Sequence, residues 1–267
     1  MDLGFGGSAT AVAGGSKGMG RAVAECLASE GARVALLARG RDALDEVAEV
    51  CRANGSPDVV ALSVDTGDRA QVDAAFGELG ARWGSLNVLV HTVGPGAGRL
   101  EELSDDDWAA TFRVGTMSAV HCARAAVPLL RRAQWGRIVN LSAHSIQRQN
   151  PMLVAYTASK AAMTSFTKNL AKSLAPDGIL VNTVSPGTIV TAAFTEGLRP
   201  IFEKEGLDPA DPHDVMRWID HVYHHPADLG RAGLPDEVAA LVVFLASRRN
   251  GYVTGANVNV DGGSDFV

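Results

Sequence analysis

The chain alternates short apolar runs with longer segments of helical periodicity, and this alternation constrains its fold more than any other feature. Apolar runs predict strands near residues 8–13, 33–38, 59–63, 87–92, 136–142, 179–184 and 256–260. Helical spacing predicts helices near 19–29, 41–53, 68–83, 104–132, 152–175 and 235–247. Strands that alternate with helices pair in parallel, and a parallel sheet carries helices on both faces. We therefore predict a three-layer, doubly wound α/β fold with a seven-stranded parallel sheet.

The length and composition fit one large core. The chain has 267 residues, of which 46% are hydrophobic and 20% charged, and no low-complexity linker interrupts it. We predict a single domain over residues 1–267. The net charge of -6 gives no electrostatic basis for binding nucleic acid or an anionic membrane.

The cysteines and the N-terminus bear on the compartment. Cys26, Cys51 and Cys122 are odd in number and lack metal-ligand spacing, which suits a reducing compartment better than a disulfide framework. No stretch approaches the roughly 20 apolar residues of a membrane span, and the N-terminus lacks a signal-peptide pattern. We expect a cytoplasmic protein.

A glycine-rich turn follows the first predicted strand and opens the first predicted helix. It reads Ala13-Gly14-Gly15-Ser16-Lys17-Gly18-Met19-Gly20. Glycine permits the tight turn and lets backbone amides at the helix N-terminus approach a pyrophosphate. The turn predicts a dinucleotide site.

A second motif, Tyr156 with Lys160 four residues on, lies in the predicted helix near 152–175. That spacing puts both side chains on one helix face. A free tyrosine titrates near pH 10, and a neighbouring cation lowers its pKa by roughly 1 to 3 units. We expect Lys160 to make Tyr156 a working acid/base, although the motif alone is common.

Together with Ser185-Pro186-Gly187, these motifs closely resemble the short-chain dehydrogenase/reductase family over nearly the whole chain, and in particular its 3-oxoacyl-carrier-protein reductase-like members. The resemblance implies a Rossmann fold and an oxidoreductase. It implies that Tyr156 exchanges a proton with the substrate and that Lys160 also holds the nicotinamide ribose. The further cofactor-binding positions that it implies are Gly14, Ser16, Lys17, Gly18, Met19, Gly20, Asp65, Thr66, Gly94, Pro186, Gly187, Ile189 and Thr191.

The end of the second predicted strand favours NADP over NAD. A carboxylate at this point holds the 2′-hydroxyl of NAD, whereas an arginine accommodates a 2′-phosphate. Here Ala38 is followed by Arg39, with Lys17 in the glycine turn. Arg39 and Arg41 also fit a merely solvated loop, so NAD stays the alternative.

The chain departs from the family pattern at three positions. Gly115 stands where relatives have an asparagine that holds a relay water, and Ala143 where they have a serine that binds the reacting oxygen. Ser145 shares the strand face of Ala143, so we expect it to supply the missing hydroxyl. His144 is a second candidate, and Ser145 could equally be an ordinary loop residue. His91 replaces an asparagine, and we expect it to be a packed structural residue.

The segment 192–231 is long, and we predict that it forms a lid over an apolar substrate. Its histidines, His213, His221, His224 and His225, have no accompanying cysteines. We therefore interpret them as a polar helix face and predict no metal site.

The leading hypothesis is an NADP-dependent oxidoreductase that interconverts a ketone and a secondary alcohol. The alternative is a catalytically impaired dinucleotide-binding protein that acts as a sensor or structural partner, because Gly115 and Ala143 replace usual catalytic residues. Reduction of a carrier-bound thioester would depend on Arg124, Arg131 and Arg132, which resemble a solvated helix face. The family resemblance implies a homotetramer or homodimer.

Overall fold

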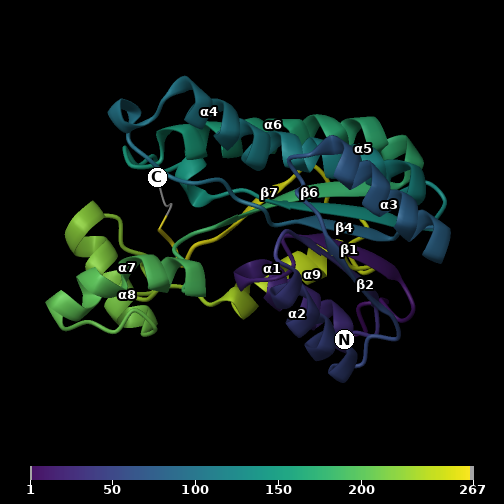
Figure 1. Ribbon diagram of the computed structural model, residues 1–267, viewed down its shortest axis with the longest axis horizontal. Helices are drawn as coiled ribbons and strands as arrows, with labels where there is room; N and C mark the ends of the chain where they lie inside the picture. Colours follow the sequence, from purple (N-terminus) through teal and green to yellow (C-terminus); the bar gives the residue numbers. More distant parts are fainter. Residues whose placement is uncertain (1, 265–267) are drawn as a thin grey trace.

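The computed structural model describes residues 2–264 and contains a seven-stranded sheet between two layers of helices (Figure 1). The sheet order is β3-β2-β1-β4-β5-β6-β7, and every pair is parallel. This confirms the predicted doubly wound Rossmann fold. The strands are β1 (Ala9–Ala13), β2 (Arg33–Ala38), β3 (Val59–Ser63), β4 (Val88–His91), β5 (Gly136–Leu141), β6 (Ile179–Pro186) and β7 (Asn257–Val260).

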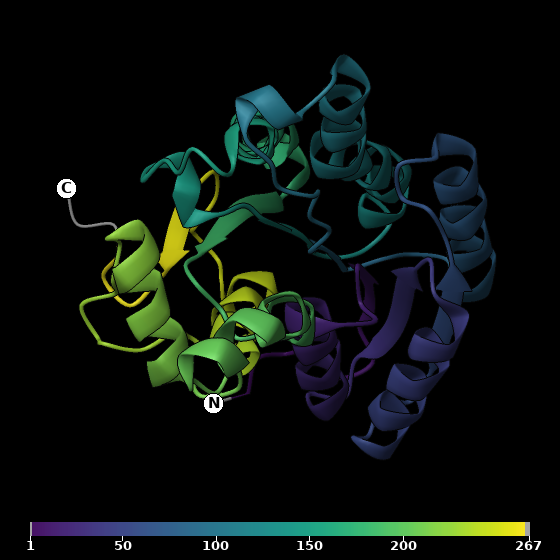
Figure 2. The ribbon, with the colours of Figure 1, turned by 60° about the vertical axis from the view of Figure 1, so that its left-hand side comes forward.

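The helices form one layer on each face of the sheet (Figure 1). One layer holds α1 (Gly18–Ser29), α2 (Arg41–Ala53) and α9 (Pro235–Ala246). The other holds α3 (Arg69–Trp83), α4 (Asp105–Phe112), α5 (Ser118–Leu130) and α6 (Val154–Leu174). Two further helices, α7 (Ala192–Glu205) and α8 (Pro212–Tyr223), lie together at one end of the molecule, as Figures 1 and 2 both show.

The core is divided by the sheet into two apolar clusters. In β1, Ala9, Ala11 and Ala13 pack with the α3, α5 and α6 layer, whereas Val12 packs with α1, α2 and α9. All four are fully buried, because a strand turns alternate side chains to opposite faces and both faces here are covered. Burial on both sides explains why the strands read as near-continuous apolar runs.

A third, smaller cluster holds α7 and α8 together. Phe202 of α7 is fully buried, and its ring centroid lies 5.5 Å from that of Trp218 in α8. Trp218 in turn contacts Tyr223 edge to face at 5.5 Å. These helices therefore have apolar contacts of their own, distinct from the two clusters that flank the sheet.

The segment predicted as one helix over 104–132 is interrupted. α4 ends at Phe112, and a π-helical turn, Arg113–Met117, leads into α5. We call this segment the π turn. Gly115 at its centre is buried against α6, where a Cβ would come within 2.4 Å of Ser159 Oγ. The missing side chain is what lets the two segments approach so closely.

The strand order reverses direction between β1 and β4, which lead to opposite halves of the sheet. In open parallel sheets, ligands bind beyond the carboxyl ends of the strands at such a switch point. Within residues 2–264, no helix has both the length and the apolar character needed to cross a membrane.

Candidate active site

A cleft of about 850 Å³ opens beyond the carboxyl ends of β1, β2, β3 and β4. Several sequence-predicted positions meet in it, although they come from separate loops. Those lining the cleft are Gly14, Ser16, Lys17, Gly18, Met19, Gly20, Arg39, Asp65, Thr66, Gly94 and Thr191. Residues that the sequence analysis did not single out, among them Pro95, Arg113 and Val114, also line it.

The glycine turn forms one wall, and its geometry suits a phosphate group. Gly14 has a φ of +85°, and a Cβ on Gly20 would come within 2.2 Å of the Gly14 carbonyl oxygen. α1 begins at Gly18, and the Lys17 side chain does not cap it. The first amides of α1 thus lack a side-chain acceptor, as anion binding at a helix N-terminus requires.

The second wall carries the side chains that bear on whether the site suits NADP or NAD. Exposed Lys17 and Arg39 both line the cleft beside Ala38 and Gly40, and β2 ends without a carboxylate. This set of donors fits a 2′-phosphate better than a free 2′-hydroxyl. At the end of β3, Asp65 lines the cleft while the neighbouring Asp68 caps α3 by accepting from the Ala70 and Gln71 amides.

Tyr156 and Lys160 lie side by side on α6, next to this cleft. Lys160 Nζ is 6.0 Å from the centroid of the Tyr156 ring. Nζ donates hydrogen bonds to the carbonyl oxygens of Leu141, at 2.6 Å, and Val93, at 3.0 Å. A Cβ on Gly94 would lie 4.0 Å from Tyr156 Cε2. The lysine thus ties α6 to the ends of β4 and β5, and the phenol ring faces the glycine in the cleft wall.

The expected lowering of the Tyr156 pKa by Lys160 is wrong for this structure. Burial raises the pKa of Tyr156 to about 12. Burial also lowers the pKa of Lys160 to about 7, because little water reaches an ammonium that is only 2% exposed. Desolvation therefore sets the direction of both shifts, and the phenol is protonated at neutral pH.

The residues after β5 place three serine or alanine positions in different surroundings. Ser142 Oγ donates to the Lys160 carbonyl oxygen at 3.3 Å and accepts from Thr164 Oγ1 at 2.8 Å, so it faces α6. A 3-10 turn, His144–Ile146, begins directly after Ala143 and ends the strand alternation. Ser145 is 2% exposed, and its Oγ accepts a 3.0 Å hydrogen bond from Thr157 Oγ1. The hydroxyl thus lies beside the residue that follows Tyr156.

His91 is fully buried at the end of β4. Its Nε2 is 2.8 Å from Ser118 Oγ, and Ser118 Oγ donates to the Val114 carbonyl oxygen. Because the serine proton is used in that bond, Nε2 carries the histidine proton. Burial and the charge of Lys160 lower the pKa of His91 to about 3. His91 is a packed structural residue, as predicted, and it links β4 to the π turn.

The turn after β6 carries the remaining predicted positions, of which only Thr191 lines the cleft. Pro186 ends β6, and its carbonyl oxygen is 3.2 Å from His144 Nδ1. A Cβ on Gly187 would lie 2.8 Å from Asp261 Cα, so glycine is needed there. Ile189 is buried, and Thr191 caps α7 and packs on Gly18. This turn therefore joins α7 to the glycine turn.

The histidines of residues 192–231 and the three cysteines do not line the cleft. No group of three or more His, Cys, Asp or Glu side chains among residues 2–264 is placed to hold a metal.

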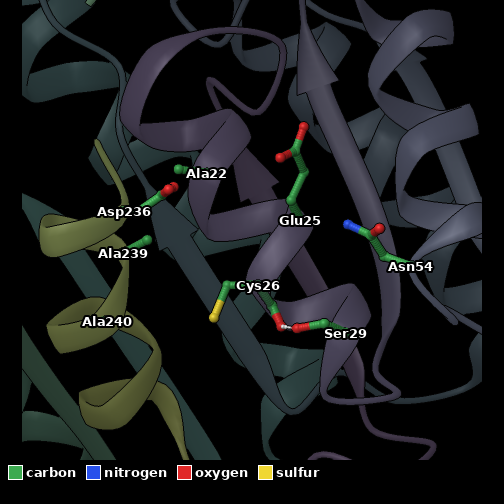
Figure 3. A pocket seen from close by; sticks show the side chains of 8 residues that line it. All are labelled: Ala22, Glu25, Cys26, Ser29, Asn54, Asp236, Ala239 and Ala240. Carbon is green, nitrogen blue, oxygen red and sulfur yellow. Dashed lines mark hydrogen bonds between the residues drawn. The ribbon is translucent and has the colours of Figure 1, made fainter. Parts of the chain in front are cut away.

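Cys26 lines a separate cavity of about 380 Å³ between α1 and α9, shown in Figure 3, where Asp236 points toward Ala22. Burial, with Glu30 and Asp236 nearby, raises the pKa of the Cys26 thiol. A raised pKa makes this thiol a poor nucleophile.

Comparison with known proteins identifies close relatives over the whole chain. The family model described as enoyl-(acyl carrier protein) reductase matches residues 13–265. The short-chain reductase protein NovJ of Streptomyces niveus is 33% identical over 96% of this chain and 93% of its own. The 3-oxoacyl-[acyl-carrier-protein] reductase FabG of Aquifex aeolicus is 30% identical over 98% of this chain and 99% of its own.

A solved structure matches the fold equally fully. The L-sorbose reductase of Gluconobacter frateurii, complexed with NADPH and L-sorbose, superimposes with a TM-score of 0.92 at 30% identity. The match covers 100% of both chains. The likeness therefore includes α7 and α8 as well as the sheet.

Proposed function

The chain belongs to the short-chain dehydrogenase/reductase family, and from this we propose that it is an NADP-dependent oxidoreductase that interconverts a ketone and a secondary alcohol. One observation carries the proposal. Tyr156 and Lys160 are held beside the cleft at Gly94, the same cleft that the glycine turn lines. A proton donor and a dinucleotide cradle therefore share one site.

The cofactor is NADP, which Lys17 and Arg39 would hold at its 2′-phosphate and the α1 amides at its pyrophosphate. When bound, its nicotinamide ring supplies or accepts the hydride. The NADPH complex of the L-sorbose reductase supports this choice.

The cofactor choice predicts tighter binding of NADPH than of NADH. Arg39→Ala should weaken the binding of NADPH by roughly tenfold, the effect of one lost charged contact of about 1.4 kcal/mol. The affinity for NADH should stay nearly unchanged. Titration of protein fluorescence with each dinucleotide measures both constants. Tighter binding of NADH by the unaltered protein would contradict the assignment.

The proton chemistry follows from burial. Because the pKa of Tyr156 is about 12, the phenol carries its proton at neutral pH and can give it to a carbonyl oxygen. Lys160 lies beside the ring and stabilises the phenolate that remains. This protonation state favours the direction of ketone reduction.

Ser145 is our candidate for the hydroxyl that Ala143 lacks. Its Oγ accepts from Thr157, so its own proton remains available for a substrate oxygen. We predict that Ser145→Ala lowers the rate constant of hydride transfer by about a hundredfold, as loss of one oxyanion donor does. Ser173→Ala, on the exposed end of α6, is the matched control. An unchanged rate constant in Ser145→Ala would remove Ser145 from the mechanism.

We propose that residues 192–231, which contain α7 and α8, form the substrate lid of a single domain. Their separate apolar cluster around Phe202 and Trp218 lets this segment move as a unit over the site. Rapid digestion of this segment by protease in the free protein, and protection by NADPH with substrate, would support a lid. Equal digestion in both states would contradict it.

We further propose a cytoplasmic homotetramer or homodimer. β7 is an unpaired edge of the described sheet, and fully exposed Tyr252 and partly exposed Phe244 lie in the adjoining loop and helix. The three free cysteines support a reducing compartment. Sedimentation as a monomer would contradict the assembly.

A second candidate function is a dinucleotide-binding protein without turnover. Gly115 and Ala143 favour it, because neither can supply the polar side chain found at these positions in relatives. The Tyr156–Lys160 pair favours the enzyme, since a binder has no need of a proton donor at the cleft wall. Turnover of NADPH with a carbonyl substrate distinguishes the two.

A further inference from the structure

Arg113 reaches from the π turn to the end of β3, 48 residues earlier in the chain. Its Nη1 lies 3.3 Å from Asp65 Oδ2, and both residues line the cleft. The Arg113 side chain is 51% exposed and that of Asp65 is 34% exposed. An ion pair this exposed contributes only about 0–1 kcal/mol to stability, so folding alone does not account for its place in the cleft wall.

The Arg113 side chain lies over the turn after β3. A Cβ on Gly67 would come within 2.6 Å of Arg113 Nη1 and 3.3 Å of its Cγ, so the arginine passes directly over the Gly67 backbone. The Gly67 amide donates to Asp65 Oδ1 at 2.8 Å, while Arg113 holds Oδ2. Both carboxylate oxygens are therefore fixed, and the carboxylate keeps one orientation.

A second contact fixes the same turn from α5. His121 Nδ1 is 3.3 Å from the Thr66 carbonyl oxygen, and His121 is buried. Thr66 lines the cleft next to Asp65. The end of β3 is thus held by the π turn and by the helix that follows it.

We propose that Arg113 is an adenine-binding residue of the dinucleotide site, which orients the Asp65 carboxylate toward the 6-amino group and contacts the base with its guanidinium plane. Carboxylate oxygens accept from an amino group, and a guanidinium stacks on aromatic faces. One Arg113 nitrogen is committed to Asp65, which leaves most of its planar fork available to a ligand. This inference rests on the proposed dinucleotide site and adds to it a recognition residue for the base.

The role differs from that of Lys17 and Arg39. Those side chains lie by the glycine turn and the end of β2, where they would meet phosphates. Arg113 comes from the π turn and lies at the turn after β3, where its partner is the Asp65 carboxylate. Its removal should therefore affect recognition of the base, and not only the general attraction of an anion.

The test measures binding by calorimetry and needs no turnover. The probes are 2′,5′-ADP, 5′-AMP and the hypoxanthine analogue of 2′,5′-ADP, which lacks the 6-amino group. We expect Arg113→Gln to weaken the binding of both adenine probes by about tenfold, which is near the upper end of the free energy of a cation–aromatic contact. It should also reduce the preference for adenine over hypoxanthine. Arg113→Lys, which keeps the charge but loses the plane, should recover only part of the affinity.

Arg124→Gln is the matched control. Arg124 is exposed on α5, and its replacement removes the same charge without touching the cleft. Unchanged adenine affinity in Arg113→Gln, or equal losses in both variants, would overturn the proposal. If the wild-type protein bound 5′-AMP as tightly as 2′,5′-ADP, the result would contradict only the NADP assignment. Binding of neither adenine probe would reject the dinucleotide site and the role of Arg113 with it.

Discussion

At the residue scale, burial decides the chemistry of the groups around the site. Lys160 and His91 are both buried. The pKa of each lies well below its ordinary value, at about 7 for Lys160 and about 3 for His91. Removing water disfavours a positive charge more than nearby carbonyl oxygens favour it. His91 is therefore neutral, and Lys160 can lose its proton near pH 7.

The buried His91 predicts a pH dependence of stability. Below pH 6.5 an unfolded histidine binds a proton that folded His91 does not, so the free energy of unfolding falls as the pH falls from 6.5 toward 3. One such group gives a slope of up to about 1.4 kcal/mol per pH unit. The pKa values of Asp58 and Glu237 are lowered to about 2, so these carboxylates change the free energy of unfolding mainly below pH 5.

We therefore expect His91→Asn to flatten the dependence between pH 6.5 and pH 5. Urea unfolding at several pH values measures it. The variant also loses the hydrogen bond to Ser118, so the slope, and not the absolute stability, is the quantity compared. An identical slope in the two proteins would show that His91 becomes protonated within the fold.

The proposed catalytic pair is visible in the sequence, but its surroundings are not. Tyr156 and Lys160 could be found because a four-residue spacing on a helix is visible in the sequence. Their pKa values could not, because the burial that sets them comes from β4 and β5, far away in the chain. Arg113 escaped notice for the same reason, since Asp65 precedes it by 48 residues.

At the element scale, the π turn packs closely on α6. A Cβ on Gly115 would meet Ser159 Oγ at 2.4 Å and Pro95 Cγ at 3.1 Å. Ser159 is fully buried and donates to the Tyr156 carbonyl oxygen at 3.0 Å. The space beside Gly115 is thus occupied by the Ser159 side chain.

This packing predicts a double-mutant effect. Gly115→Ala should destabilise the protein by about 1–3 kcal/mol, the usual cost of overpacking. In a Ser159→Ala background, where the closest atom is gone, the same change should cost at least about 1 kcal/mol less. Thermal and urea unfolding of the four proteins give the coupling energy.

Gly77 provides the control for helix propensity. It lies within α3, and a Cβ there would meet no atom within 4 Å. Gly77→Ala should therefore stabilise the protein by about 0.4–1 kcal/mol. If Gly115→Ala behaved like Gly77→Ala, the close contact between the π turn and α6 would be wrong.

The strands and most helices could be predicted to within a few residues, because apolar runs and helical spacing are local signals. The π turn could not, since residues 104–132 carry one continuous helical pattern. The two lid helices were missed although α8 carried usable signals. Asp211 precedes Pro212, and Val215, Met216 and Ile219 follow at helical spacing.

At the scale of the whole molecule, the sheet order gathers the site from distant parts of the chain. The reversal between β1 and β4 opens the cleft, and Lys160 ties α6 to its edge through the ends of β4 and β5. α7 follows directly from the turn after β6, where Thr191 packs on Gly18. The glycine turn, the proposed proton donor and the proposed lid therefore lie at one end of the sheet.

The central claim is that this arrangement reduces a carbonyl with Tyr156 as the proton donor. The most direct measurement is single-turnover oxidation of NADPH against a panel of ketones, diketones and steroids, with wild-type protein and Tyr156→Phe. We predict turnover of at least one panel member, lost by a factor of about 100 or more in Tyr156→Phe while NADPH still binds. Undiminished turnover in Tyr156→Phe, or tight NADPH binding by the wild type without turnover of any member, would contradict the account.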